Sequence, residues 1–495
     1  MDIHRFLGLV FLGITSLFSC GDGDVHITKS LDEEITIYPD YKEVTIPVNI
    51  APLNFSVADS SEYCLILKGR ESQIQVRSDK GLFVIPQREW KNLLSENAGN
   101  EIELTVAKLT DGAWNAYTPF HIQVAKDSID PYIAYRLLAL SNMWSKMGIY
   151  QRDLESYEQS VIYENSLTGY NCVNCHSFPS RDPKKLVFHM RGTINGSVLI
   201  DGKRVTKLNT KTPETISNFS YMYMHPSGDF LAATVCRTYQ NFFVNNPNTL
   251  EVQDDNSDIV IYDVERNEIF TCESLNSKDA WQIYPTFSPD GKSLYFCATA
   301  AVDSVTKNFW QTNYSLCRID FDAETRTFGQ QVDTLYNGRL NHKSVSFPRV
   351  SPDGKYLAFT LQAYGSFGVW HTDADLYMVR LSDGEVYPLT EANSPDVGDS
   401  YHSWSGNSHW LVFSSRRIDG LYTCPFFTYI DEEGQAHKPF LLPQKNPVKY
   451  YKDLMLTYNL PEFIEGKVQL DKHAILKTMR DTKGVQVQVR HREGH

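Results

Sequence analysis

Two stretches of the chain are nearly identical: PDGKSLYF at residues 289–296 and PDGKYLAF at residues 352–359. In each, a turn built from Asp and Gly leads into a run of apolar and aromatic residues, which is typical of a strand that follows a tight turn. Weaker copies are DPKKLVF at 182–188, PSGDFLAA at 226–233 and WSGNSHWLVF at 404–413. The chain therefore repeats one structural unit, and this repeat decides the fold.

The spacing of the copies indicates what the unit is. Their central leucines lie 45 to 63 residues apart, and a second strand-like phrase follows each copy, such as DIVIYD at 258–263. A four-stranded blade of a β-propeller has this length, because each blade buries its faces only against its neighbours. Five blades are visible over residues 178–447. We expect a sixth, completed by the extension at residues 448–495 or by a strand before residue 172.

The first 127 residues are predicted to form a signal peptide and one small domain. In residues 20–127, apolar and polar residues alternate in short runs such as EITIY at 34–38 and IELTV at 102–106. Alternation with a period of two is typical of half-buried strands. We expect an immunoglobulin-like β-sandwich here, so that the whole chain is mainly β.

Residues 128–177 are predicted to form a helical connector. Asp130 and Pro131 suit the N-cap and first position of a helix, and apolar residues follow at helical spacing. These residues are Ile133, Leu137, Leu140 and Trp144. A second, more polar helix is expected over residues 151–164.

Residues 1–19 are predicted to be a signal peptide. The apolar run from Phe6 to Phe18 is too short to cross the ~30 Å of a membrane's hydrocarbon core. The stretch LFSC at 17–20 resembles a bacterial lipobox, in which Cys20 becomes the lipidated N-terminus. The alternative is an ordinary secretory signal that contains a cysteine. We expect the lipid on Cys20 to attach the chain to the outer membrane, on its periplasmic or surface face.

The charge of the chain argues against one class of partner. Its 47 Lys and Arg against 60 Asp and Glu give a net charge of −13, without a basic block. Affinity for nucleic acid comes largely from basic side chains that displace counterions from phosphates, so no nucleic-acid partner is expected.

The motif that carries chemistry is CVNCH at residues 172–176. Cys172 and Cys175 at this spacing can each add to one vinyl group of a haem, and His176 can then bind the iron as its proximal ligand. One motif predicts one covalent haem c. A zinc site or a redox dithiol remains an alternative, but zinc would need a second ligand pair, and none is evident.

The repeat also suggests a second ligand for the iron. At equivalent positions of the copies, His189 and His225 replace the small residues of the other blades. His189 is ranked first as the distal iron ligand, His225 second and Met190 third. The alternative for each histidine is an ordinary hydrogen-bonded residue of a strand.

The SPDGK phrases over residues 178–447 resemble the repeats of TolB-type, WD40-like six-bladed propellers. With the haem motif, the chain from about residue 130 resembles Bacteroidetes lipoproteins that join CxxCHSF to such a propeller. That resemblance implies haem binding and electron transfer at the cell envelope.

Two functions follow as hypotheses. The first is an envelope-anchored c-type cytochrome that transfers electrons to a redox or envelope partner docked on the propeller. The alternative is a scaffold or binding lipoprotein for a polypeptide or glycan, in which haem is structural or sensory. Either would be an electron-transfer or binding protein rather than an enzyme that turns over a substrate. Six further cysteines are scattered, and a Cys297–Cys317 disulfide remains possible.

Overall fold

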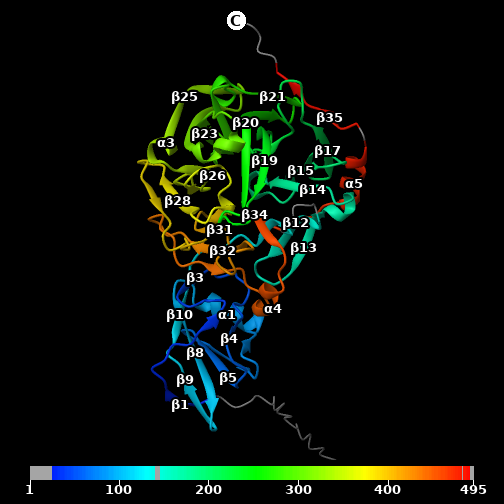
Figure 1. Cartoon of the computed structure of the whole chain (residues 1–495). Helices are drawn as coiled ribbons and strands as arrows, with labels where there is room; N and C mark the ends of the chain where they lie inside the picture. Colours follow the sequence, from blue (N-terminus) through cyan, green and yellow to red (C-terminus); the bar gives the residue numbers. More distant parts are fainter. Residues whose placement is uncertain (1–24, 140–144, 482, 491–495) are drawn as a thin grey trace, which may run out of the picture.

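The computed structural model of the chain describes residues 25–139, 145–481 and 483–490 (Figure 1). Residues 1–19 and the predicted lipidation site Cys20 lie outside the described residues, as does the side chain of Cys175. The described chain is mainly β, as predicted. No helix within these ranges is long and apolar enough to cross a membrane.

Six sheets of four or five strands make up the larger part of the described chain. The first consists of β14 (Cys172–Ser177), β15 (Lys185–Arg191), β16 (Gly196–Asp201) and β17 (Arg204–Asn209), with β35 (Val485–Gln486) at its edge. The second consists of β18 (Ser220–Met224), β19 (Phe230–Phe242), β20 (Leu250–Asp263) and β21 (Glu268–Phe270), with β36 (Gln488–Val489) at its edge.

The third sheet consists of β22 (Ala280–Phe287), β23 (Ser293–Ala300), β24 (Ser315–Asp322) and β25 (Thr327–Tyr336). The fourth consists of β26 (Ser344–Val350), β27 (Tyr356–Gln362), β28 (Asp375–Arg380) and β29 (Val386–Pro388). The fifth consists of β30 (Asp399–Trp404), β31 (Trp410–Ser415), β32 (Cys424–Tyr429) and β33 (Phe440–Leu441). The short helices α2 (Val305–Asn308) and α3 (Gly338–Asn341) lie in connections of the third sheet and between the third and fourth.

The sixth sheet joins two distant parts of the chain. Its strands are β13 (Gln159–Glu164), β12 (Met147–Asp153), β11 (Tyr132–Leu138) and, from near the C-terminus, β34 (Thr457–Ile464). β34 contacts β30 of the fifth sheet and β14 of the first, so it closes the six sheets into a ring. Six four-stranded units in a closed ring are the arrangement of a β-propeller. A strand before residue 172 and a strand after residue 447 both contribute to the last unit.

The helical connector predicted over residues 128–177 is wrong. The expected helices are occupied by β11, β12 and β13. The Asp130 carboxylate accepts a hydrogen bond from the Gly406 N–H at 2.7 Å, across the molecule, instead of capping a helix. Pairing of β11 with the distant strand β34 overrides the helical spacing of its apolar residues, because tertiary contacts outweigh local propensity.

The predicted repeat occupies the same position in each of the first five sheets. The five central leucines all lie in the second strand of their sheet and are fully buried: Leu186, Leu231, Leu294, Leu357 and Leu411. The Asp-Gly phrases form the turns that precede these strands, and Gly291 and Gly354 have φ near +72° there. Such a backbone conformation favours glycine.

A separate domain precedes the ring. Its larger sheet contains β1 (Ile27–Ser30), β3 (Val44–Ile46), β5 (Tyr63–Lys68), β6 (Gln73–Ser78), β8 (Glu101–Thr110), β9 (Ala113–Ala116) and β10 (Phe120–Val124). Its smaller sheet contains β2 (Ile37–Tyr38), β4 (Phe55–Val57) and β7 (Leu82–Phe83), and α1 (Gln87–Glu96) follows.

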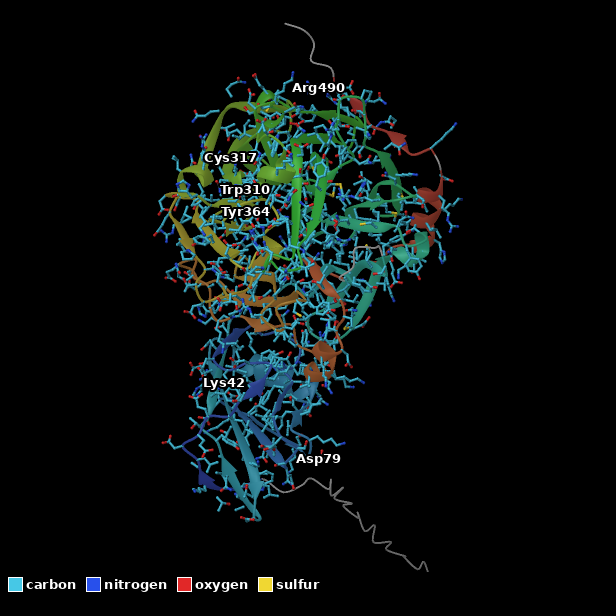
Figure 2. All side chains as sticks on the ribbon, viewed as in Figure 1. Lys42, Asp79, Trp310, Cys317, Tyr364 and Arg490 are labelled. Carbon is cyan, nitrogen blue, oxygen red and sulfur yellow. The ribbon has the colours of Figure 1, made fainter. Side chains whose placement is uncertain are left out.

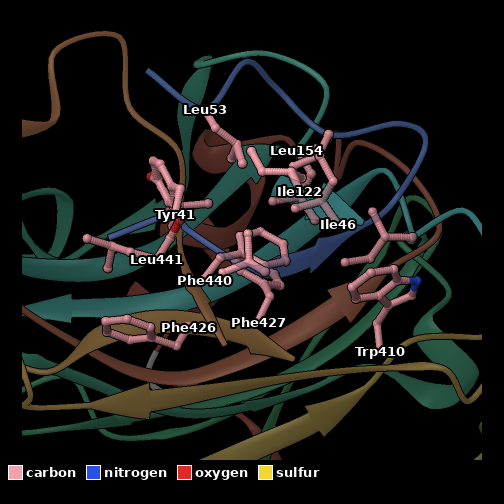
Figure 3. Packing of buried hydrophobic residues seen from close by; sticks show 14 of the residues in the cluster. Tyr41, Ile46, Leu53, Ile122, Leu154, Trp410, Phe426, Phe427, Phe440 and Leu441 are labelled. Atoms are coloured by element: carbon pink, nitrogen blue, oxygen red, sulfur yellow. The ribbon is translucent and has the colours of Figure 1, made fainter. Parts of the chain in front are cut away.

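This domain packs on the fifth sheet of the ring through a shared apolar core (Figure 3). Tyr41 from the N-terminal domain lies beside Phe440 and Leu441, and its hydroxyl donates to the Leu441 carbonyl at 3.2 Å. Thr45 Oγ1 and His437 Nδ1 are hydrogen-bonded at 2.8 Å. Because core residues and hydrogen bonds cross the boundary, the two parts form a packed unit.

Two more helices flank the sheets, one before β34 and one after it. Helix α4 (Pro447–Lys452) lies next to β4, and α5 (Lys472–Arg480) packs beside β17. No disulfide joins the six scattered cysteines, all of which lie in the described ranges, so the possible bond between Cys297 and Cys317 is not formed.

Candidate functional site: an axial cavity

The innermost strands of the six sheets share one irregularity. β14, β18, β22, β26, β30 and β34 each carry one residue more than the partner strand, which makes a bulge. The four-residue bulge segments are NCHS (174–177), SYMY (220–223), IYPT (283–286), SFPR (346–349), SYHS (400–403) and NLPE (459–462). The CVNCH motif therefore ends inside the repeated bulge segment, with Cys175 and His176 at the two bulge positions.

At the first bulge position, aromatic rings fill the axis of the ring. Tyr221, Tyr284, Phe347 and Tyr401 come from four successive sheets, and all have a positive φ near 50°. Neighbouring rings in this series have centroids 4.5, 4.1 and 4.6 Å apart. These aromatic contacts close the channel at this level.

A long hairpin covers the axis on one side of these rings. β19 and β20 are the longest strands of the ring and cross its centre (Figure 1). Tyr221 donates to the buried Asp254 carboxylate of β20 at 2.9 Å. Glu251 of the same strand accepts from the Tyr364 hydroxyl at 3.0 Å, and it lies 3.2 Å from His371 Nε2. Tyr364, labelled in Figure 2, lies in the connection between β27 and β28 of the fourth sheet, so the hairpin is fixed across the ring.

At the second bulge position, the axis contains a cavity of about 90 Å³. Polar and charged residues in its wall include His176, His402, Glu462, Arg349 and Arg181, and aromatic residues include Tyr223 and Trp404. A volume of this size accommodates a few water molecules. The cavity therefore gathers several titratable side chains around the axis.

His176 lies in this wall with its side chain fully buried. Neither ring nitrogen has a hydrogen-bond partner among the described residues, and Nε2 is 3.9 Å from Glu462 Oε2. Burial, helped by the charge of Arg136, lowers the pKa of His176 to about 4, so the ring is neutral. The carbonyl of Leu460 opposes this shift but does not meet hydrogen-bond geometry. A neutral imidazole keeps one N–H, and leaving it unpaired costs about 1–3 kcal/mol.

His402 has the same environment. It is 3% exposed, and neither ring nitrogen has a hydrogen-bond partner within the described ranges. Burial lowers its pKa to about 3, although the carbonyls of Ala358 and Phe347 lie near enough to oppose the shift. Sequence reasoning missed His402. The available signal was its place in the repeat, because Tyr401 and His402 match Cys175 and His176 in their bulges.

Glu462 lies on β34 of the sixth sheet, between the fifth sheet with His402 and the first sheet with His176. Its Oε1 accepts the Phe178 N–H at 3.1 Å. Burial raises the pKa of Glu462 to about 8, and the positive charges of Arg349 and Arg181 only partly offset this rise. The carboxyl is therefore mostly protonated near neutral pH.

The side chain of Cys172 does not face the axial cavity. Its buried sulfur accepts a hydrogen bond from the Arg136 guanidinium at 3.5 Å, beside Met147, and it is not part of the cavity wall. The side chains of Cys172 and His176 therefore face different spaces, and one porphyrin could not bond to the Cys172 sulfur and also lie beside the His176 ring in this arrangement. The described strand β14 does not fit a covalent haem.

The predicted distal ligands are not brought to His176 either. His189 Nδ1 is hydrogen-bonded to Ser197 Oγ at 3.0 Å within the first sheet. His225 uses both ring nitrogens, on Ser227 Oγ at 2.9 Å and on the Gly291 carbonyl at 3.2 Å. Met190 is buried in the apolar core of the first sheet. None of the three lines the cavity.

The pKa of Glu462 predicts an unusual pH dependence of stability. Between pH 4.5 and 8 the folded state keeps a proton that the unfolded chain has lost, so this contribution to stability falls as pH rises. Glu462→Gln removes this pH-dependent contribution, because an amide does not titrate. The free energy of unfolding of Glu462→Gln, relative to the parent, should increase from pH 5 to pH 8 in chemical denaturation. Glu465→Gln, at an exposed carboxylate, is the control; equal pH dependence in both variants would contradict the assignment.

Among the comparisons with known proteins, only solved structures match the chain. No family model matches it, and no curated protein matches it. Similar solved structures include an oligogalacturonate lyase in complex with manganese, at 13% identity and a TM-score of 0.37 over 63% of this chain and 75% of that one. Prolyl endopeptidases are also similar, at 14% identity and a TM-score of 0.35 over 55% of this chain and 37% of that one. A puromycin hydrolase is similar at 10% identity and a TM-score of 0.30 over 69% of this chain and 45% of that one. At TM-scores below 0.5 these similarities carry no argument about the fold or the function of this chain.

Proposed function

We propose that the chain is an envelope lipoprotein whose TolB-like propeller binds a polypeptide or glycan end in its axial cavity. The observation that supports this most is the pair of buried histidines with unpaired ring nitrogens, His176 and His402, in the wall of a cavity. Buried polar groups are normally paired, so these atoms are available to a ligand. Aromatic side chains beside them, Tyr223 and Trp404, suit the apolar parts of such a ligand.

The binding proposal is tested with the purified chain and a panel of oligosaccharides and short peptides, using thermal shift and calorimetry. A ligand of the cavity should bind the parent at least about tenfold more tightly than Arg349→Met, because loss of a charged hydrogen-bond donor costs about 1.5–3 kcal/mol. Arg318→Met, on β24 away from the cavity, should bind like the parent. Binding that is equal in both variants, or no binding by any probe, would contradict the proposal.

In this proposal Cys20 carries the lipid, and the N-terminal domain, as an immunoglobulin-like sandwich, holds the propeller at a fixed distance from the outer membrane. Cys20→Ala should move the protein from the membrane fraction to the soluble periplasmic fraction and abolish incorporation of labelled fatty acid. The membrane partner is the lipid bilayer, and no nucleic acid takes part. A Cys20→Ala chain that stays in the membrane fraction, with label, would refute the anchor.

A second candidate is the c-type cytochrome that exchanges electrons with a redox or envelope partner. The CVNCH motif and the unpaired nitrogens of His176 favour it. When bound, haem c would supply one-electron chemistry, and Cys172, Cys175 and His176 would hold it. Since the described β14 does not fit this group, attachment would require the strand to leave its pairing with β15.

Expression with a haem-maturation system separates the two candidates. The first proposal predicts folded, colourless protein without a pyridine haemochrome signal. Cys172→Ala should then change neither fold nor ligand binding. A covalent haem signal that is lost in both Cys172→Ala and Cys175→Ala would instead establish the cytochrome.

A further inference from the structure

The wall of the axial cavity contains hydrogen-bond donors and an acceptor that are left unpaired. Among the described residues, the Arg349 guanidinium donates one hydrogen bond, from Nη1 to the Pro348 carbonyl at 2.8 Å. Glu462 uses Oε1 to accept the Phe178 N–H at 3.1 Å, and its Oε2 makes no hydrogen bond within the described ranges. The same wall therefore offers a ligand both kinds of polar partner.

His176 and His402 add the same mixture of donor and acceptor. Their four ring nitrogens have no hydrogen-bond partner in the described part of the chain. A neutral imidazole, which is the ordinary form above pH 7, carries one N–H donor and one lone-pair acceptor. Burial favours this form of both rings by lowering their pKa values. A ligand of this wall must therefore both donate and accept hydrogen bonds.

Hydroxyl groups meet this requirement, and charged chain ends do not. A hydroxyl donates one hydrogen bond and accepts up to two, so it can pair with an imidazole, with Arg349 or with Glu462. A carboxylate only accepts, and it would lie beside the Glu462 carboxyl. An ammonium only donates, and it would lie beside the positive charges of Arg349 and Arg181. Either end of a polypeptide would thus leave part of the wall unpaired, whereas several hydroxyls on one small ring can pair with all of it.

The apolar part of the wall suits the same kind of ligand. Trp404 donates from its indole nitrogen to the Arg349 carbonyl at 3.0 Å, so its ring remains as an apolar surface. Tyr223 is half-buried, and the Arg349 guanidinium carbon lies 4.9 Å from its ring centroid. A pyranose has hydroxyls around its edge and C–H faces that pack on aromatic rings. The cavity has room for several water molecules, and one pyranose unit displaces a comparable volume.

We infer that the axial cavity binds the terminal sugar of an uncharged glycan. The sugar hydroxyls pair with the unpaired polar side chains of the wall, which are those of His176, His402, Arg349 and Glu462. Because the aromatic rings at the first bulge position close the axis beyond the cavity, only a sugar at a chain end enters it. This inference rests on the proposed binding function and names its ligand class, a glycan end rather than a polypeptide end.

The test uses the full chain with Cys20→Ala and two sets of probes in calorimetry. One set consists of short neutral oligosaccharides that end in glucose, galactose, mannose or N-acetylglucosamine, together with uronate-ended counterparts. The other consists of short peptides with free and with blocked termini. At least one neutral oligosaccharide should bind with a stoichiometry of one, and its uronate-ended counterpart should bind more weakly. No peptide should compete with it.

Deoxy sugars then locate the contacts. Removal of a hydroxyl that pairs with a histidine should weaken binding to the parent by at least about tenfold, because a polar group enclosed by the ligand is left unpaired. In His402→Phe, which keeps an aromatic ring without donor or acceptor, removal of the hydroxyl that pairs with His402 should change the affinity little. His176→Phe tests the other ring in the same way. His473→Phe, at an exposed histidine of α5, should bind each sugar like the parent.

Circular dichroism and thermal unfolding check that each variant is folded. Where a phenylalanine is not accommodated, His176→Leu or His402→Leu replaces that variant. If every deoxy sugar loses as much affinity in the folded variants at both positions as in the parent, the site is excluded.

The outcomes also separate this inference from the proposed function. Binding of a peptide that needs Arg349, without binding of any oligosaccharide, would support the function and overturn the inference. Failure of every probe, peptides included, would refute the proposed function itself. A covalent haem on the motif would overturn the inference, because iron would then use His176.

Discussion

Closure of the ring by β34 is the constraint on which the site depends. The strand comes from near the C-terminus and pairs along its whole length with β11, more than 300 residues earlier in the chain. This pairing completes the sixth sheet and brings Glu462 to the axis beside His176. Without it the first and fifth sheets would each expose an apolar face, and the two ends of the axial wall would not meet. Closure of the ring and assembly of the candidate site therefore both depend on the pairing of β11 with β34.

The repeat was predictable from the sequence because its turn chemistry is local. Asp-Gly turns and a following apolar run identify the second strand of each sheet, and the five leucines all lie there. The helices predicted before the motif were wrong because the apolar residues of β11 happen to suit helical spacing. Their partner strand, β34, is remote in sequence, and no local pattern of residues reveals such a pairing.

The candidate site was only partly predictable. His176 was singled out by its motif, and the structure places it in the cavity wall. The motif does not show that the end of CVNCH is also a bulge of the propeller repeat, which gives His176 the position that Pro285, Pro348 and Pro461 hold in other sheets. His402 and Glu462 carry no motif of their own. Both are candidate site residues because of their neighbours in the cavity wall. For His402 the ring nitrogens add to this, because they have no hydrogen-bond partner among the described residues.

The stack of aromatic rings at the first bulge position has one more consequence. With Tyr284 and Phe347 packed across the axis and the β19–β20 hairpin behind them, the hollow beside His176 is closed on that side. A long polymer could not be threaded through such a molecule. If the proposed polypeptide or glycan binds there, only its terminus could enter, and the aromatic stack would favour chain ends over chain interiors.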